Sequence, residues 1–285
     1  MDRHFSRIYL EITNCCNLRC SFCPGTSRKP GFLSPAQFRL LAEKLRPYTD
    51  YLYLHVMGEP LLHPQLGALL EICRELGFRV ILTTNATLIA QQTETLLAAP
   101  ALHKLSFSLH SFEANTGGDL QGYLSPCMDF AEKAAGKGVI TAFRLWNLDG
   151  AQTKGLHELN GAITDALRAR FPEPWKQDSR GVRLAPGIFL DYGERFDWPD
   201  LHACDNGETG TCRALRDQIA VLCDGTVVPC CLDSDGVIAL GNLFTQEPAQ
   251  ILQGEQAERL YRGFLNRRRL HPLCRHCGYS RRFDR

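Results

Sequence analysis

The stretch that decides the fold is Ile8-Tyr-Leu-Glu-Ile12, which is followed by Cys16-Asn-Leu-Arg-Cys20-Ser-Phe-Cys23. The first part is an apolar run that predicts a short strand. The second part places three cysteines on one loop with the spacing C-x3-C-x2-C. Three thiolates this close together can ligate three corners of a cubane iron–sulfur cluster and leave the fourth iron without a protein ligand. An open iron of this kind is suited to holding a substrate.

The composition limits the class of protein. The chain has 285 residues, with 32 Lys and Arg and 31 Asp and Glu, so its formal net charge is +1. This length allows one large domain, or a large domain and a small one. The balanced charge predicts neither a DNA-binding nor a membrane surface, and no apolar run approaches the roughly 20 residues that span a bilayer. The N-terminus does not resemble a signal peptide, so we expect a cytoplasmic protein. We interpret the basic runs Arg267–Arg269 and Arg281–Arg282 as a solvated helix end and a solvated tail.

The 13 cysteines are unevenly distributed, because four lie in residues 15–23 and seven in residues 204–277. In a chain with no secretory signal we do not expect disulfides, so this many thiols indicate metal or redox chemistry. The uneven distribution predicts two separate metal centres.

Apolar runs alternate with segments of helical periodicity over the first two thirds of the chain, which predicts β/α units and a parallel sheet. Ser34-Pro35 opens the first helix, because serine is a good N-cap and proline suits the first helical position. The expected strands cover residues 7–13, 51–56, 78–84, 103–109, 139–146 and 187–191. After the first helix, further helices are expected over residues 64–76, 88–98, 126–136 and 156–170.

The pattern changes after about residue 195. Two apolar runs within residues 218–230 flank Asp224-Gly225, a pair that is typical of a tight hairpin turn. A helix is expected at about 255–266, and a C-x2-C pair follows it. We therefore divide the chain into residues 1–195 and residues 196–285.

The second expected strand ends in Met57-Gly58-Glu59-Pro60, one β/α unit after the three cysteines. Together the two motifs resemble those of the radical S-adenosylmethionine (SAM) enzymes, which usually carry Gly-Gly-Glu-Pro here, so that Met57 departs from the pattern. The resemblance implies an α/β fold, a partial (β/α)6 TIM-like barrel. It also implies a 4Fe–4S cluster ligated by Cys16, Cys20 and Cys23, with SAM on the open iron. Reductive cleavage of SAM then yields a 5′-deoxyadenosyl radical.

The same resemblance implies which side chains contact SAM. Phe22 corresponds to an aromatic residue near the adenine, and Gly58 and Glu59 to the motif that meets the ammonium group. Arg144 is expected at the SAM carboxylate, because a guanidinium suits a carboxylate. For the positions on the third to fifth strands, an ordinary capping or packing role stays open. The full set is Phe22, Gly58, Glu59, Asn85, Ser108, His110 and Arg144.

Four cysteines near the end of the chain have the spacings C-x17-C and C-x2-C: Cys212, Cys230, Cys274 and Cys277. Gly225 stands five residues before the second of them. This spacing resembles the Twitch domain, a shortened relative of the SPASM domain of some radical SAM enzymes. It implies a small β-hairpin plus helix that holds a second, auxiliary 4Fe–4S cluster with four Cys ligands. A structural zinc site with the same ligands stays an alternative, as does a ligand role for Cys204 or Cys231.

The function expected from these motifs is that of an oxidoreductase. In this hypothesis the radical removes a hydrogen atom from a small molecule, an alcohol on an aminocyclitol or sugar, and the auxiliary cluster accepts the remaining electron. Asp191 and Glu194 follow the sixth strand and are candidates for taking up the proton. The first cluster receives its electron from a flavodoxin or a ferredoxin.

Two alternatives remain open. A radical SAM maturase that modifies a peptide or protein would share both clusters. The first strand begins within seven residues of the start, which leaves no room for the N-terminal extension that such enzymes often carry. A protein of another class would be a non-catalytic iron–sulfur or zinc module that binds a partner. The Gly58-Glu59 motif and the three-cysteine loop argue against that class, and SAM binding would separate the two.

Overall fold

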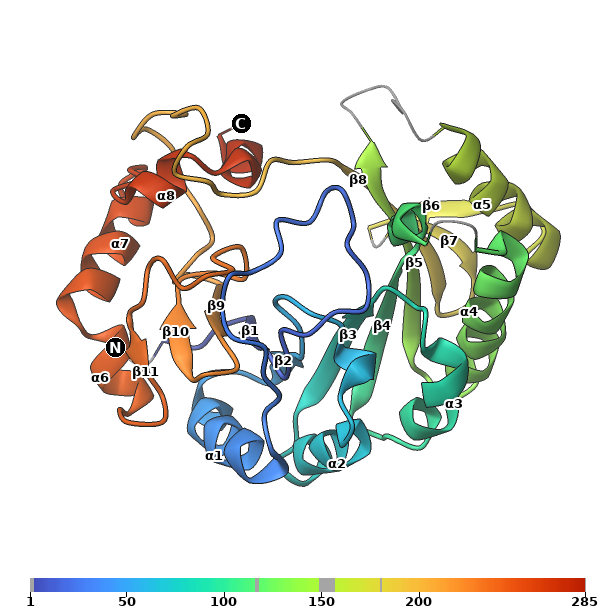
Figure 1. Ribbon diagram of the computed structural model, residues 1–285, viewed down its shortest axis with the longest axis horizontal. Helices are drawn as coiled ribbons and strands as arrows, with labels where there is room; N and C mark the ends of the chain where they lie inside the picture. Colours follow the sequence, from blue (N-terminus) through green and yellow to red (C-terminus); the bar gives the residue numbers. More distant parts are fainter. Residues whose placement is uncertain (1–2, 116–117, 149–156, 180, 285) are drawn as a thin grey trace.

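A computed structural model describes residues 3–115, 118–148, 157–179 and 181–284. Their strands form one curved sheet of 11 strands in the order β11-β10-β9-β1-β2-β3-β4-β5-β8-β7-β6 (Figure 1). The strands are β1 (Arg7–Leu10), β2 (Tyr51–Tyr53), β3 (Arg79–Thr84), β4 (Leu102–Ser108), β5 (Ile140–Leu148), β6 (Lys176–Asp178), β7 (Gly181–Ala185), β8 (Ile188–Glu194), β9 (Gln218–Val221), β10 (Thr226–Val228) and β11 (Gly241–Asn242).

Helices α1 to α5 cover the outer, convex face of this sheet, and α6 to α8 lie beside its C-terminal strands (Figure 1). Their bounds are α1 (Pro35–Leu45), α2 (Leu66–Glu75), α3 (Ile89–Leu97), α4 (Leu120–Ala135), α5 (His157–Arg170), α6 (Pro248–Leu252), α7 (Glu255–Leu265) and α8 (Pro272–Arg275). Short 3-10 helices cover Arg46–Tyr48, Pro60–Leu62, Leu109–Ala114 and Gly278–Phe283.

The predicted parallel sheet is present. The six strands expected from the sequence are β1, β2, β3, β4, β5 and β8, and each pairs in parallel with the next. Among the described residues the sheet does not close, because it continues into β9 on one side and into β7 and β6 on the other. The fold is therefore the expected α/β partial barrel. Its parallel strands end at one common edge, where folds of this kind bind their ligands.

Alternation along the strands separates the side chains into two layers. Ile8, Leu52 and Phe143 belong to the main core that packs under the helices. Tyr9 points to the opposite, concave face and forms a second, smaller cluster with Leu222 and Val228. The concave face is where the polar residues of the candidate site lie.

Helix α1 forms for the local reasons that the sequence indicates. The Ser34 hydroxyl accepts a hydrogen bond from the Gln37 backbone N–H, and the Gln37 side chain accepts one from the Ser34 N–H in return, so the helix begins with a complete capping box. Pro35 occupies the first turn. Phe38 and Leu41 are fully buried, and each such burial stabilises the fold by roughly 1.5–3 kcal/mol.

Two local features differ from the expectation. Helix α4 begins at Leu120 rather than near 126, because the Asp119 carboxylate accepts hydrogen bonds from the backbone N–H groups of Gln121 and Gly122, both at 3.0 Å. Pro126 therefore lies inside the helix. Strands β6 and β7 also pair in antiparallel fashion on the outer edge of β8, where no strand was expected.

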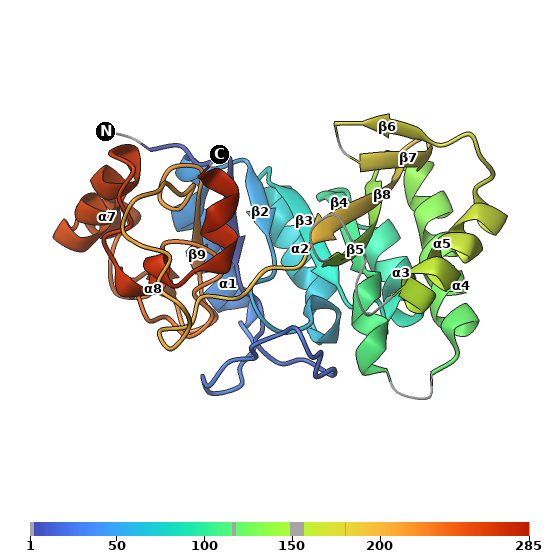
Figure 2. The same ribbon diagram turned by 90° about the horizontal axis from the view of Figure 1, so that it is seen from above.

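The C-terminal hairpin continues the barrel sheet. Strand β9 pairs in parallel with β1, and β10 and β11 follow in antiparallel order. The C-terminal elements and the β6–β8 edge lie at opposite ends of the molecule (Figure 2). The hairpin itself was expected, whereas its pairing with the first strand was not. The boundary between residues 195 and 196 stays a prediction, because one sheet runs through both parts.

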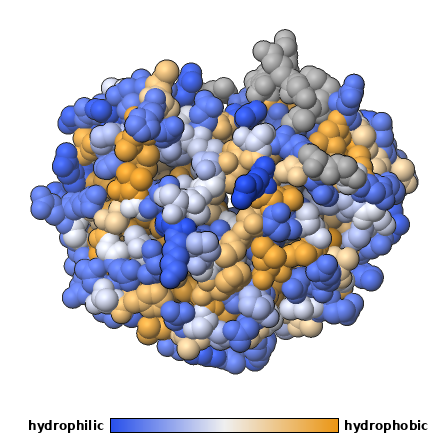
Figure 3. All heavy atoms as spheres, in the orientation of Figure 1, coloured by the Kyte–Doolittle hydropathy of each residue, from blue (hydrophilic) through white to orange (hydrophobic). Residues whose placement is uncertain are grey.

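The surface and the helices agree with the balanced composition. The face seen in Figure 3 mixes hydrophilic residues with several smaller hydrophobic groups, as is usual for globular proteins. No helix among the described residues is both long and apolar enough to cross a membrane.

Candidate functional site

The loop between β1 and α1 carries the three cysteines near the middle of the molecule, drawn in blue in Figure 1. The Cys23 backbone N–H donates to the Cys20 carbonyl at 3.1 Å, so the second and third cysteines share one tight turn. Burial raises the pKa of the Cys20 thiol to about 12, and the neighbouring Cys23 and Cys16 thiols add to the rise. The three sulfur atoms are therefore close enough to influence one another, as ligands of one cluster must be.

Gly58 lies directly against the start of this loop. Its φ is +75°, and a Cβ at this position would stand 2.6 Å from the Thr13 carbonyl oxygen and 2.8 Å from that of Cys15. The following Glu59 N–H donates to the Cys15 carbonyl at 2.8 Å. Only glycine satisfies both the left-handed backbone and the close approach, so Gly58 fixes the end of β2 to the cysteine loop.

Glu59 is buried, and its carboxylate accepts three hydrogen bonds from the protein. The donors are the Leu61 N–H at 2.9 Å, the Thr84 hydroxyl at 2.7 Å and the Asn85 N–H at 2.6 Å. Burial raises its pKa to about 7, and these hydrogen bonds oppose the rise. The side chain thus joins the ends of β2 and β3. Its expected contact with the SAM ammonium stays a prediction.

The other positions expected at SAM gather at the same edge of the sheet. The Asn85 amide donates to the Cys16 sulfur at 3.8 Å and to the Asn17 side chain at 2.8 Å. The Phe22 and His110 rings pack with centroids 4.7 Å apart. Ser108 ends β4 at the point where it pairs with Arg144 of β5. The structure brings these side chains together around the cysteine loop, and their roles toward SAM stay predictions.

Arg144 and Asp191 form an ion pair on the concave face. Arg144 Nε lies 3.5 Å from Asp191 Oδ2, and the two side chains are 17% and 25% exposed. The guanidinium also donates to the Thr83 hydroxyl at 3.2 Å and lies over the Trp146 ring. Burial lowers the pKa of Arg144, and Asp191 opposes this shift. Of the two carboxylates expected to take up a proton, Asp191 faces this group, whereas the Glu194 side chain is exposed.

The concave face also holds polar atoms that the sequence did not single out. His55, just beyond β2, packs edge-on against the Tyr9 ring, with centroids 5.5 Å apart. Burial, together with the Arg144 charge, lowers the pKa of His55 to about 3, so the imidazole is neutral. His55 Nδ1 and Trp146 Nε1 are buried and have no hydrogen-bond partner among the described residues. Such atoms are suited to meeting a polar ligand.

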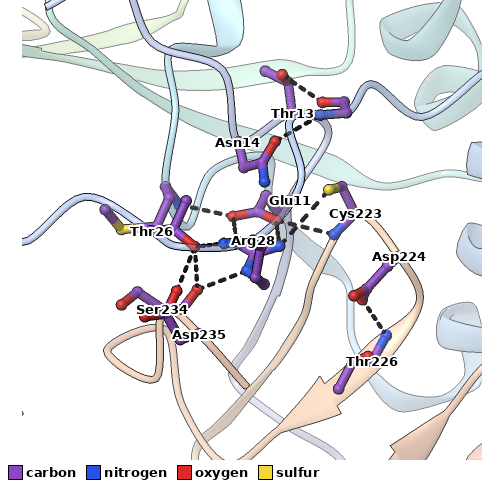
Figure 4. Close-up of polar contacts among 12 residues, drawn as sticks. Glu11, Thr13, Asn14, Thr26, Arg28, Cys223, Asp224, Thr226, Ser234 and Asp235 are labelled. Carbon is purple, nitrogen blue, oxygen red and sulfur yellow. Dashed lines mark hydrogen bonds and ion pairs between the residues drawn. The ribbon is translucent and has the colours of Figure 1, made fainter. Parts of the chain in front are cut away.

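An ion pair between the buried Glu11 and the partly buried Arg28 joins the cysteine loop to the C-terminal hairpin (Figure 4). The two carboxylate oxygens accept from Arg28 at 2.7 and 2.8 Å, from the Met57 N–H at 3.1 Å and from the Cys223 N–H at 3.0 Å. Arg28 Nε donates to the Ser234 carbonyl at 2.8 Å. A lone charge in the apolar run of residues 8–12 is the sequence signal that could have identified Glu11.

The four C-terminal cysteines line one cavity. Cys277 is buried and the other three are half-buried. Burial raises the pKa of Cys230 well above its usual value, and the other thiols of the group raise it further. Within the described part of the chain, no three His, Cys, Asp or Glu side chains converge closely enough to hold a single metal ion. The cysteines therefore surround a volume, and do not meet at one point.

Arg269 lines the same cavity and corrects an expectation. The run Arg267–Arg269 was interpreted as solvated, but Arg269 is fully buried. Arg267 adopts a left-handed φ of +56°, and the Arg269 backbone N–H donates to the Glu208 carbonyl at 2.6 Å. The chain turns at Arg267, and this turn directs the third arginine of the run inward.

Two family profiles match this arrangement. The profile of the radical SAM superfamily matches residues 10–151, and that of the SPASM iron–sulfur cluster-binding domain matches residues 212–278. A partial barrel with a three-cysteine loop at the carboxyl ends of its strands defines a radical SAM enzyme. The chain belongs to the radical SAM superfamily and carries a C-terminal SPASM-type domain, so its cofactors are a 4Fe–4S cluster, SAM and an auxiliary iron–sulfur cluster.

The described residues fit these groups. Cys16, Cys20 and Cys23 offer three thiols on the single loop between β1 and α1, which is the donor set that a cluster with an open iron requires. The four C-terminal thiols line one cavity, into which Arg269 brings a buried guanidinium. The match to an iron–sulfur domain favours a cluster over zinc at this second site.

The S-adenosyl-L-methionine-dependent 2-deoxy-scyllo-inosamine dehydrogenase of Niallia circulans is 28% identical over 118 residues, which is 39% of this chain and 47% of that protein. The chain matches less than half the length of its curated relatives.

Solved structures show the same fold over nearly the whole chain. BtrN in complex with AdoMet and 2-DOIA superposes with a TM-score of 0.61 and 18% identity, over 97% of this chain and 94% of that chain. Streptococcus suis SuiB bound to precursor peptide SuiA superposes with a TM-score of 0.61 and 16% identity, over 96% and 71%. At such identities the likeness shows the fold alone.

Proposed function

We propose that the protein oxidises a hydroxyl-bearing carbon of a small polar molecule, such as an aminocyclitol or sugar, to a carbonyl. The observation that carries this proposal is the Arg144–Asp191 pair on the concave face, beside the unpartnered His55 and Trp146 nitrogens. A carboxylate held by a guanidinium is suited to hydrogen-bonding and deprotonating a hydroxyl. The inosamine dehydrogenase relative and the BtrN neighbour support the same substrate class.

We assign the first cluster to Cys16, Cys20 and Cys23, and the auxiliary cluster to Cys212, Cys230, Cys274 and Cys277. When bound, reduced cluster and SAM supply the 5′-deoxyadenosyl radical that removes a hydrogen atom. Gly58 holds the end of β2 against the cysteine loop. The Asn85 amide donates to the Cys16 sulfur, and the Phe22 ring of the loop packs on His110, so both contacts fix the position of the loop. A flavodoxin or ferredoxin is the proposed source of the initial electron.

After the hydrogen atom leaves, one proton and one electron must be removed before the carbon–oxygen double bond forms. Asp191 takes the proton from the hydroxyl oxygen, and the Arg144 guanidinium, 3.5 Å away, holds that carboxylate in place. An auxiliary cluster held by Cys212, Cys230, Cys274 and Cys277 would supply the acceptor for the electron. The step balances, because the substrate loses two hydrogen nuclei and two electrons. One nucleus and one electron leave together as the hydrogen atom, and the other nucleus and electron leave as the proton and the single electron.

Modification of a peptide is the second candidate function. It is favoured by the SuiB structure, which holds a precursor peptide and superposes over 96% of this chain. A peptide substrate would use the same cluster sites and would place a side chain, instead of a ring alcohol, beside Arg144.

The test supplies anaerobically reconstituted protein with SAM, dithionite and 2-deoxy-scyllo-inosamine deuterated at the carbon that bears the reacting hydroxyl. We expect one deuterium in the 5′-deoxyadenosine and an equivalent amount of ketone, both measured by mass spectrometry. Deoxyadenosine without deuterium would contradict this alcohol as substrate and leave the peptide candidate. A protein that neither binds SAM nor forms deoxyadenosine would instead be a non-catalytic module.

A further inference from the structure

Arg269 is the largest fully buried side chain of the molecule's described part and lines the four-cysteine cavity. Its Nη2 pairs with the carboxylate of Asp284, the residue after the last 3-10 helix. Its Nε and Nη1 are buried and have no hydrogen-bond partner among the described residues. A buried cation with two idle donors costs free energy unless another group satisfies it.

The space for this guanidinium is built into the neighbouring backbone. Gly210 has a φ of +147°, and a Cβ there would stand 2.1 Å from Arg269 Nη2 and 2.3 Å from Cζ. The Gly210 N–H is tied to the Arg267 carbonyl at 2.8 Å. Any larger residue at 210 would overlap the guanidinium. Glycine at this position therefore allows Arg269 to place its charge at the cavity.

We propose that Arg269 donates N–H hydrogen bonds to the sulfur atoms of the auxiliary cluster and raises its reduction potential. The inference rests on the assignment of the four C-terminal cysteines under the proposed function. Hydrogen bonds to cluster sulfurs and nearby positive charge favour the reduced form, which carries one more negative charge. A raised potential suits this cluster to receive an electron from a substrate radical.

Arg269 and all four C-terminal cysteines line the same cavity. A cluster held by these thiols would therefore lie beside the guanidinium.

The experiment is an EPR-monitored redox titration in the full-length Cys16→Ala, Cys20→Ala, Cys23→Ala background, in which the C-terminal site holds the remaining cluster. For Arg269→Gln we expect at least a tenfold loss in the equilibrium constant for one-electron reduction, a shift of about 59 mV to lower potential. For Asp284→Asn we expect a shift to higher potential, since the counter-charge of Arg269 is removed. Arg268→Gln is the matched control, because it removes the same charge from an exposed neighbour, and it should leave the potential unchanged.

Opposite shifts in Arg269→Gln and Asp284→Asn support the proposal, since a purely structural role predicts no such reversal of sign. If Arg269→Gln fails to assemble the cluster, the sign of the Asp284→Asn shift decides. Potentials equal to that of the background in the variants that assemble would overturn the role of Arg269 alone. Absence of iron and labile sulfide from the background protein would overturn the cysteine assignment as well.

Discussion

Two arginines, the largely enclosed Arg28 and the fully buried Arg269, show how differently the two ends of the sheet are built. Arg28, on the cysteine loop, gives both terminal nitrogens to Glu11 and its Nε to the Ser234 carbonyl. Arg269, in the C-terminal cavity, has one acidic partner and two idle nitrogens. The first pair is complete within the protein and acts as a clamp between segments. The second is incomplete, as expected for a residue whose remaining partners belong to a bound group.

A buried charged side chain can therefore have one of two roles. Which role it has is indicated by whether groups of the protein satisfy all of its hydrogen-bond donors. A saturated pair holds the fold, and its removal is expected to change stability. An unsaturated charge serves a ligand, and its removal is expected to change the properties of that ligand.

The largest effect is expected at the three-cysteine loop. In the Cys16→Ala, Cys20→Ala, Cys23→Ala variant, deoxyadenosine formation should fall to background, because no ligands remain for the cluster that binds SAM. About four irons should stay with the C-terminal site. Iron analysis and chromatography of SAM products measure both. Deoxyadenosine at wild-type level would refute the cysteine assignment, and loss of all iron would show that the two sites are not independent.

Asp191→Asn should separate hydrogen-atom removal from proton removal. We expect ketone formation to fall by about 10²–10⁴-fold, the usual contribution of a positioned general base, while deuterium transfer into deoxyadenosine persists. Glu194→Gln is the control, since it changes an exposed carboxylate on the same strand. Equal losses in the two variants, or full ketone yield in Asp191→Asn, would argue against a base at 191.

Glu11→Gln should destabilise the fold by about 3–5 kcal/mol, because it leaves the Arg28 charge buried without its counter-charge. Urea unfolding followed by circular dichroism measures the change. The Glu11→Gln, Arg28→Met double variant should recover part of the loss, since it removes the unpaired charge. Glu71→Gln, in an exposed pair with Arg74, is the control and should be indistinguishable from wild type. A Glu11→Gln protein as stable as this control would contradict the clamp.

The last prediction concerns the pH dependence that His55, on the concave face, gives to stability. Its pKa is about 3 in the folded protein, lowered first by burial and then by Arg144, against about 6.5 when unfolded. The unfolded chain therefore binds the proton first, and stability contributed by the neutral imidazole is lost as pH falls from about 6.5 toward 3. His55→Phe should reduce the slope of unfolding free energy against pH in this window by up to about 1.4 kcal/mol per pH unit.

His110, with a pKa lowered by burial to about 4, should maintain part of that slope in His55→Phe. The control His4→Gln changes an exposed histidine and should leave the slope as it is. An unchanged slope in His55→Phe would show that this imidazole is protonated equally in the two states.

Much of the fold was predictable because its signals are local. The apolar runs and caps of the β/α units lie within a few residues of one another, as at Ser34 and Gln37. The pairing of β9 with β1 was not predictable, because its register joins Arg7 to Gln218 with no local signature. Strands β6 and β7 were missed for a related reason, since their exposed residues show no clear alternation.

In the candidate site, too, the residues with local sequence motifs could be predicted, whereas those that depend on contacts between distant segments could not. The cysteines and Met57-Gly58-Glu59-Pro60 form motifs with fixed spacing, so they could be found in the sequence. Arg267, Arg268 and Arg269 are identical in type, and only the turn at Arg267 decides that the third is buried. His55 Nδ1 and Trp146 Nε1 are buried without hydrogen-bond partners only because folding brings their segments together in the sheet, and no local sequence pattern reveals this.

The pairing of β1 with β9 also has a consequence for synthesis on the ribosome. The outer edge of β1 is completed by residues about 210 positions later in the chain. At the usual elongation rate of about 5–20 residues per second, that edge waits about 10–40 s for its partner. During this interval a short apolar strand presents unpaired N–H and C=O groups, which are a template for pairing with other chains. A chaperone that shields nascent strands should therefore raise the yield of this protein more than that of a barrel whose first strand pairs only with its immediate successor.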